Sequence, residues 1–219
     1  MRTKKLRNRL IVSSTLTAIL ALSGCSTVTL NHEDARALSS VKVAPVNAKT
    51  VTYYGRLPSE YDVDQNGGLS DAVVSLFKQT DLARKKSKRM EMLLEEAGVD
   101  VLGGVKEAFT HELASSTLFP EVVSAGDADA VFQLDASYGV QSETMTDDVY
   151  TPWLELKARL VKKDGSVLWK RTARVSGTDS GIKPLPFPDP FIDAALLRSH
   201  FDQAIAFAVA ELADHMAAD

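Results

Sequence analysis

The chain has 219 residues, of which 25 are Lys or Arg and 29 are Asp or Glu, and its formal net charge is −4. This length suits one domain with a substantial hydrophobic core. An acidic chain lacks the positive face that nucleic-acid binding requires, so we expect no nucleic-acid partner. Because Cys25 is the only cysteine, an intrachain disulfide is excluded.

The first 24 residues have the three zones of a secretory signal. Five basic residues lie within the first nine positions, Leu10–Leu22 is apolar or small, and Ser23-Gly24 precedes Cys25. The apolar run is shorter than the roughly 20 residues of a membrane-spanning helix. We therefore expect cleavage, with an uncleaved N-terminal anchor as the alternative. Met1–Gly24 holds five of the basic residues and no acidic residue, so its removal leaves 195 residues with a formal charge of −9.

The tetrapeptide Leu22-Ser23-Gly24-Cys25 resembles the lipobox of bacterial lipoproteins. This resemblance implies that the Cys25 thiol carries a diacylglycerol and that its new amine receives a fatty acid such as palmitate. Several acyl chains anchor a protein stably, whereas one chain gives only marginal membrane binding. Because Ser26 stands where Asp would imply retention in the inner membrane, the resemblance implies an outer-membrane anchor facing the periplasm. A buried core cysteine is the alternative.

The polar segment Ser26–Ser40 predicts a tether, so that residues 25–40 hold the lipidated cysteine and a linker. We expect a single periplasmic domain over residues 41–219. Val41–Val46 predicts its first strand, which Pro45 ends or places at an edge. Val51–Tyr54 predicts either an extension of that strand or a strand that pairs back.

Helical patterns follow a predicted loop at Leu57–Gly68, and residues of about 69–97 form a helical insertion. A first helix is capped by Ser70, and a second runs from about Thr80 to Ala97 and stops at Gly98. The basic run Arg84–Arg89 is interpreted as a solvated face, with contact to anionic headgroups or an acidic partner as the alternative. Asp100–Phe119 predicts a further helix ending before Pro120; its helically spaced apolar residues are Leu102, Val105, Phe109 and Leu113.

Three later segments alternate between apolar and polar residues and predict strands. Their apolar sets are Phe132, Leu134, Ala136, Tyr138 and Val140 in Ala130–Val140; Leu154, Leu156, Ala158 and Leu160 in Trp153–Val161; and Val167, Trp169, Ala173 and Val175 in Ser166–Val175. Asp164-Gly165 predicts a hairpin between the last two. Because one face is apolar and the other polar, we expect antiparallel strands with helices over the apolar face.

Two elements close the chain. Gly181–Phe191 holds four prolines and predicts a stiff, extended crossover, with a docking segment for a partner as the alternative. Ala194–Met216 predicts a long amphipathic helix that packs on the sheet, with a ligand channel as the alternative. Its stripe consists of Phe201, Ala204, Ile205, Ala208, Val209, Leu212 and Met216.

We therefore predict an α+β fold with a small, mostly antiparallel sheet of about four strands and helices packed on one face, including a long C-terminal helix. The sequence shows no nucleophile elbow or phosphate loop. The acidic run Thr144–Asp148 is interpreted as a solvated loop rather than a cation site. We expect no catalytic residue, metal site or cofactor. The four histidines, His32, His111, His200 and His215, lack metal-ligand spacing, and His200 and His215 are expected at caps or on the surface.

The pattern "DADAVFQLDASYGV … PWLELKARLVKKDGSVLWKRTARV", which begins at Asp127, resembles small periplasmic lipoprotein domains related to the TolB N-terminal domain. Similar domains occur in curli-assembly, penicillin-binding-protein activator and transporter-auxiliary lipoproteins. The resemblance covers Asp100–Met216 and the first strand, and the helical insertion departs from it. It implies a binding or assembly module and gives no catalytic residue.

We therefore expect a non-enzymatic, membrane-anchored lipoprotein that serves as a binding, scaffold or accessory module of a cell-envelope assembly or transport system. The alternatives are a carrier of a lipid or hydrophobic ligand for an envelope transporter and, less favoured, a periplasmic hydrolase. Exposed Trp and Arg dominate interface energies, and proline-stiffened loops lose little entropy on docking. The candidate partner-binding residues are therefore Trp153, Lys157 and Arg159 on the polar sheet face and Pro186 and Phe187 in the proline-rich loop.

Overall fold

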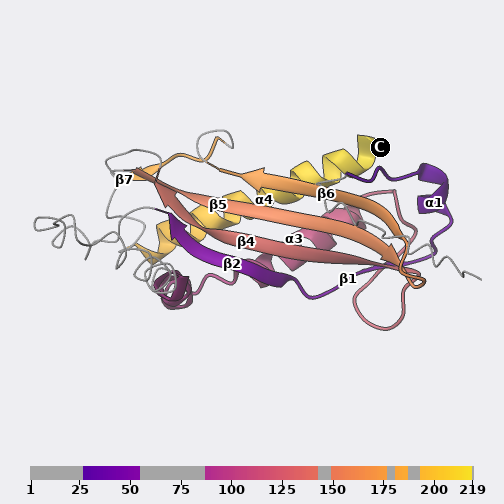
Figure 1. The fold of residues 1–219 in the computed structure, drawn as a ribbon, viewed down its shortest axis with the longest axis horizontal. Coiled ribbons are helices and arrows are strands. Elements are labelled where there is room, and N and C mark those ends of the chain that lie inside the picture. The colour runs from indigo at the N-terminus through magenta and orange to yellow at the C-terminus, as the bar shows by residue number, and fades with distance from the viewer. Residues whose placement is uncertain (1–26, 55–86, 143–148, 177–180, 187–192, 219) are drawn as a thin grey trace, which may run out of the picture.

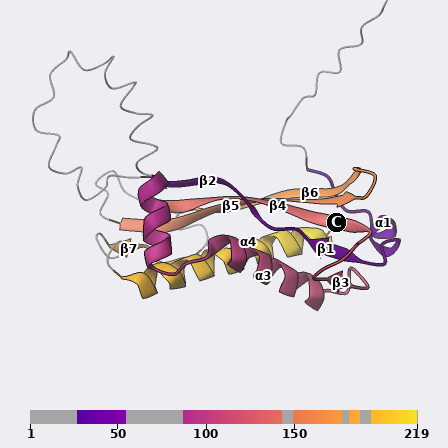
Figure 2. The same ribbon diagram turned by 90° about the horizontal axis from the view of Figure 1, so that it is seen from below.

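The structure is a computed structural model that describes residues 27–54, 87–142, 149–176, 181–186 and 193–218. In these ranges a seven-stranded mixed sheet carries α3 (Val101–Ser115) and α4 (Ala194–Ala218) on one face (Figure 1, Figure 2). This arrangement confirms the α+β class and the position of the helices. No helix within these ranges combines the length and the apolar character that crossing a membrane requires.

Two long antiparallel strands, β4 (Ala130–Ser142) and β5 (Val149–Lys162), form the centre of the sheet. Beside β5 lie β6 (Val167–Val175) and β7 (Leu185–Pro186), both antiparallel to it. Beside β4 lie β1 (Val41–Val43) and β2 (Asn47–Tyr54), both parallel to it, and β3 (Val122–Val123) pairs with β1 in parallel.

The expected sheet of about four mostly antiparallel strands is therefore wrong. Two of the seven strands, β3 and β7, have two residues each, which is too few to show alternation in a sequence. The parallel pairs arise because the chain returns from β2 to the start of β4 through a helical crossover. Val51–Tyr54 extends the first strand along β4 and does not pair back, since β1 and β2 follow one another on the same side of β4.

The helices are α1 (His32–Arg36), residues 87–96, α3 (Val101–Ser115) and α4 (Ala194–Ala218). Asp100 caps α3 by accepting a hydrogen bond of 2.8 Å from the Gly103 N–H. The predicted end at Phe119 is wrong. The hydroxyls of Ser115 and Ser116 bond to the carbonyls of the last turn, and such bonds compete with continuation of a helix.

The core lies between the sheet and the helices, and the predicted α4 stripe is buried in full. Phe132 of β4 is its centre. The ring centroid of Phe132 lies 5.2 Å from that of Phe109, 5.7 Å from that of Phe119 and 6.1 Å from that of Trp169, all in edge-to-face geometry. The predicted inward residues of β4 and β5 are likewise buried.

One predicted core residue of β6, Val167, is instead 42% exposed. The register explains this difference. Leu160 pairs with Trp169, but the next residue, Val161, pairs with Val167, so that Leu168 is an extra residue in a β-bulge. A bulge changes which side chains face the core, and alternation in the sequence alone does not reveal it.

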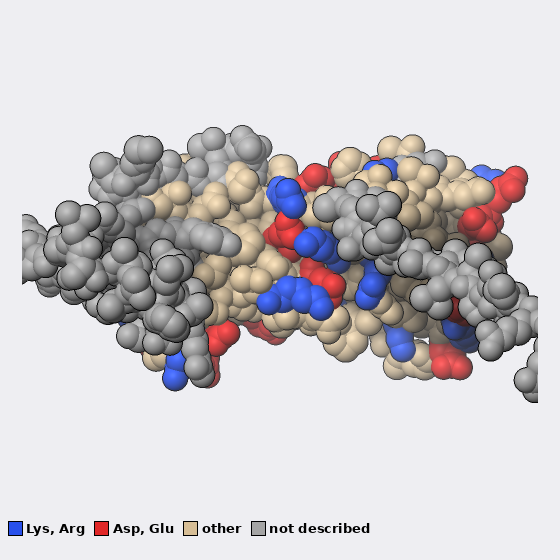
Figure 3. Space-filling view, in the orientation of Figure 1, with Lys and Arg blue, Asp and Glu red and all other residues tan. Residues whose placement is uncertain are grey.

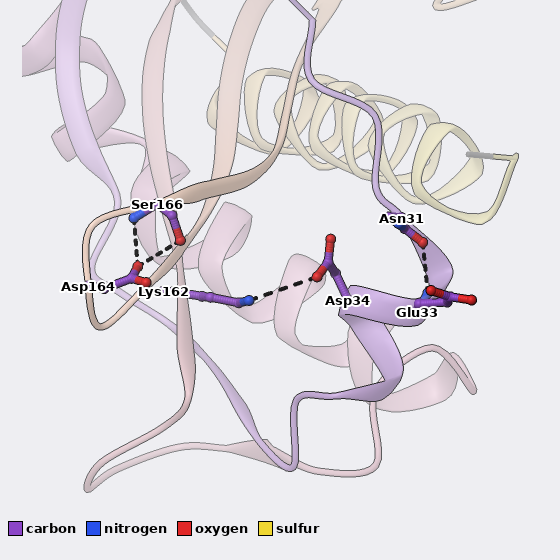
Figure 4. A network of polar contacts seen from close by, with 6 residues as sticks. All are labelled: Asn31, Glu33, Asp34, Lys162, Asp164 and Ser166. Carbon is purple, nitrogen blue, oxygen red and sulfur yellow. Dashed lines mark hydrogen bonds and ion pairs between the residues drawn. The ribbon is translucent and has the colours of Figure 1, made fainter.

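Residues 28–38 belong to the folded body, so the prediction of a tether over Ser26–Ser40 is wrong for this part. Val28 and Lys170 of β6 exchange backbone hydrogen bonds of 3.1 and 3.0 Å. The side chains of Leu30, Ala35 and Leu38 are buried in the core. Helix α1, capped by the Asn31 side chain, approaches the β5–β6 hairpin, where its Asp34 carboxylate lies 3.9 Å from the Lys162 ammonium (Figure 4). Three well-spaced apolar residues are enough to dock a segment whose composition is polar.

Candidate functional site

The face of the sheet opposite the helices, called here the outer sheet face, carries a band of charges across its middle (Figure 3). In this band the Glu155 carboxylate lies 2.8 Å from the Lys157 ammonium and 2.6 Å from the Arg174 guanidinium. On neighbouring strands, Lys49 lies 3.4 Å from Asp135. Partial burial raises the pKa of Glu155, but the hydrogen bonds from Lys157 and Arg174 outweigh it, and the pKa lies below its usual value. These ion pairs therefore link β5 to β6 and β2 to β4.

Trp153 lies on the outer sheet face, as its position in the alternation predicted, directly across from Gly139 of β4. Gly139 has no side chain to separate the two strands. A Cβ atom at this position would lie 1.6 Å from the Thr52 carbonyl oxygen of β2 and 2.8 Å from the Trp153 indole nitrogen. The indole therefore covers a glycine that β2 and β4 need for their close approach.

The five predicted partner-binding residues do not form one compact site. Pro186 of β7 pairs with Val149 at one end of β5, whereas Arg159 is ten positions further along the same strand. At about 3.3 Å per residue this is a separation of roughly 30 Å. Lys157 and Arg159 both lie on the outer sheet face. Along β5, Trp153 lies between these two residues and the end that pairs with β7. Phe187 falls outside the described residues. Their role in partner binding stays a prediction.

A groove that the sequence analysis missed lies on the solvent side of the helix layer, between α3 and α4. The α3–α4 groove has a volume of about 450 Å³. Its floor is Ile205 and Val209, and its lining is completed by Gly104, Ala108, Ala206 and Ala210 together with Glu107, His111, Glu112 and Asp202. The only sequence signal is the spacing of small residues four apart on each helix, which is common in helices that contact nothing else.

The histidines do not form a site together. His200 is buried, contrary to the prediction of a cap or surface position, and burial lowers its pKa. His215 lies on the surface, 3.9 Å from Glu211. Within the described ranges, no three His, Cys, Asp or Glu side chains gather as metal ligands would.

Several predicted features fall wholly or partly outside the described residues. Cys25, the loop Leu57–Gly68, the helix capped by Ser70, and Thr144–Asp148 lie outside entirely. Of the basic run Arg84–Arg89, the described residues 87–89 are helical: the Ser87 hydroxyl donates to the Val51 carbonyl of β2, while Lys88 and Arg89 are exposed.

No family model and no curated protein matches the chain. Among solved structures, protein XCC0632 from Xanthomonas campestris, of family DUF330, is 18% identical with a TM-score of 0.40 over 85% of this chain and 87% of that one. The hypothetical protein CT253 from Chlamydia trachomatis is 10% identical with a TM-score of 0.39, over 84% of this chain and 100% of that one. Lipoprotein GNA1162 from Neisseria meningitidis is 15% identical with a TM-score of 0.28, over 83% and 99%. Similarity at this level assigns neither family nor function.

Proposed function

We propose that this chain is a lipid-anchored, non-enzymatic accessory protein of the bacterial cell envelope, held at the periplasmic face of the outer membrane. It would bind protein partners as a scaffold of an assembly or transport system. The observation that carries the proposal is the placement of the lipobox cysteine directly before the folded body. Cys25 precedes Val28 by three residues, and Val28 is already paired with β6.

This short connection limits how far the body can lie from the membrane. Three residues span at most about 11 Å when fully extended. Acyl chains on Cys25 would therefore keep the β6 side of the body close to the lipid surface. A domain held so closely is suited to meeting partners at the membrane.

The contacts between the two layers support a scaffold over a lipid carrier. The carrier alternative requires a cavity between the α4 stripe and the sheet. Phe201 of α4 packs there against Tyr138 of β4, with 6.5 Å between ring centroids, and Phe109 of the neighbouring helix α3 packs against Phe132 of β4 at 5.2 Å. Rings that pack edge to face fill this interface rather than line a channel.

The test combines labelling of the anchor with capture of a partner. The wild-type chain should incorporate labelled fatty acid and fractionate with the outer membrane, whereas Cys25→Ser should do neither. The matched control is Ser26→Ala, which leaves the thiol in place. Crosslinking of intact cells should then join the wild-type chain to an envelope protein. Equal labelling of wild type and Cys25→Ser would overturn the proposal.

A further inference from the structure

The α3–α4 groove is suited to binding a third helix between α3 and α4. The helices run in the same direction, since the Arg198 guanidinium of α4 donates to the Ala97 carbonyl before α3, and Gly104 of α3 lies beside Ile205. The walls carry the smallest side chains, which let another backbone approach closely: Gly104 and Ala108 on α3, and Ala206 and Ala210 on α4. The buried side chains of Ile205 and Val209 give the groove an apolar floor.

The rim of the groove is acidic. The charged side chains that line it are Glu107, Glu112 and Asp202, and the lining includes no Lys or Arg. None of the three carboxylates takes part in an ion pair with another described residue. This contrasts with the outer sheet face, where Glu155 holds two basic partners. The rim therefore offers negative charge that the described part of the molecule leaves unmatched.

The surroundings of the groove are acidic as well. Over its 15 residues α3 has one Lys or Arg, Lys106, and one histidine, His111, which lies in the groove lining. Helix α4 has no Lys or Arg after Arg198, which is engaged with Ala97, and its last-turn His215 lies beside Glu211. Further along α4, Glu211 and Asp214 add negative charge, and Phe207 of the same helix is 39% exposed. A partner for this surface needs an apolar stripe for the floor and positive charges for the rim.

We propose that the α3–α4 groove binds a basic amphipathic helix of another envelope protein, with its apolar stripe on Ile205 and Val209 and Lys or Arg residues against Glu107, Glu112 and Asp202. Laying an amphipathic helix into an apolar groove is a common mode of peptide recognition. A fatty acid suits the floor, but its carboxylate is repelled by three carboxylates. This inference deepens the proposed function, on which it rests, by assigning the surface that meets the partner.

The test measures binding of two synthetic helices of about 18 residues, a length at which helices begin to be stable in water. Both have the same Leu and Ala stripe, and one carries Lys where the other carries Glu. The full, acylated chain is held in phosphatidylcholine nanodiscs, with empty nanodiscs as the background. We expect the Lys helix to bind and the Glu helix not to bind, as measured by fluorescence anisotropy.

Two triple variants show whether the groove is the place of binding. Glu107→Gln/Glu112→Gln/Asp202→Asn removes the rim charges and should weaken binding of the Lys helix about tenfold, a factor of about two for each exposed charge pair. The matched control, Glu95→Gln/Glu96→Gln/Glu121→Gln, removes as many charges from exposed positions outside the groove and should retain the wild-type affinity.

The proposal is overturned if the two triple variants bind alike, if the Glu helix binds as well as the Lys helix, or if a fatty acid displaces the Lys helix. It is also overturned if the rim variant changes the oligomeric state in the absence of peptide, since a second copy would then be the occupant. Failure of the groove assignment leaves acylation at Cys25 intact. An unlabelled Cys25 would instead overturn the proposed function, and the peptide affinities, then measured with the full chain free in solution, would still report on the groove.

Discussion

Replacement of Gly139 by alanine tests the close approach of β2, β4 and the Trp153 indole. The added methyl group would lie 1.6 Å from the Thr52 carbonyl oxygen, far inside any normal contact. That oxygen belongs to backbone, so a rotamer change cannot relieve the clash, and β2 must move away from β4 by more than an ångström. Overpacking typically costs 1–3 kcal/mol and occasionally more. Because the clash here involves a strand ladder, we expect a loss of about 3 kcal/mol.

For a domain of this size, such a loss lowers the melting temperature by about 6–12 °C. Thermal unfolding followed by circular dichroism measures it, and the Trp153 fluorescence spectrum should shift because the indole covers Gly139. Gly165→Ala is the control, since Gly165 has a φ of +87° but nothing within 4 Å of the new methyl group. Backbone strain alone should cost it about 1–2 kcal/mol. If Gly139→Ala is no more destabilising than Gly165→Ala, the clash is not real.

Three further changes have distinct outcomes. Trp169→Ala should cost about 3–5 kcal/mol in urea unfolding, because the ring is fully buried in the core, and an unchanged midpoint would contradict the face assignment. The pKa of Glu155 is lowered in the folded state, so its contribution to stability is present above the unfolded pKa of about 4.3 and is lost as pH falls through the folded value. Glu155→Gln should therefore lower the free energy of unfolding by a constant amount between about pH 6 and 8 and flatten its dependence on pH below about pH 5, which urea unfolding at each pH measures. Trp153→Ala combined with Pro186→Gly and Phe187→Ser should reduce complementation of a deletion strain; full complementation by a folded, anchored variant would place the working surface elsewhere.

The sequence predicted the long strands well because burial on one face forces strict alternation over many residues. Every residue predicted to face inward on β4, β5 and α4 is buried, although Leu197 and His200 of α4, which were not predicted, are buried as well. Prediction failed where a local feature interrupts the alternation of a strand or ends the apolar spacing of a helix. The bulge at Leu168 turned Val167 outward, and the bonds of Ser115 and Ser116 ended α3 before its predicted limit.

The surfaces were harder to predict than the core. The outer sheet face was recognised because Glu155, Lys157 and Arg159 alternate with buried residues along β5. The α3–α4 groove depends on two helices lying side by side, and alanine at positions 206 and 210 carries no signal of its own in a sequence. The charge imbalance becomes visible only when α3 and α4 are seen to share one surface.

The hydrogen bonds between Val28 and Lys170 have a consequence for how the molecule avoids self-association. On the side away from β5, a strand such as β6 presents N–H and C=O groups that invite pairing with a foreign strand. Val28 occupies such groups at Lys170, so part of the sheet edge is covered by residues that shortly follow Cys25 in the chain. If the proposed lipid anchor is present, the anchor and the protection from aggregation depend on one short segment. A shortened chain that begins after Leu30 would lose both at once, and its tendency to aggregate would reflect the unguarded edge rather than the missing lipid alone.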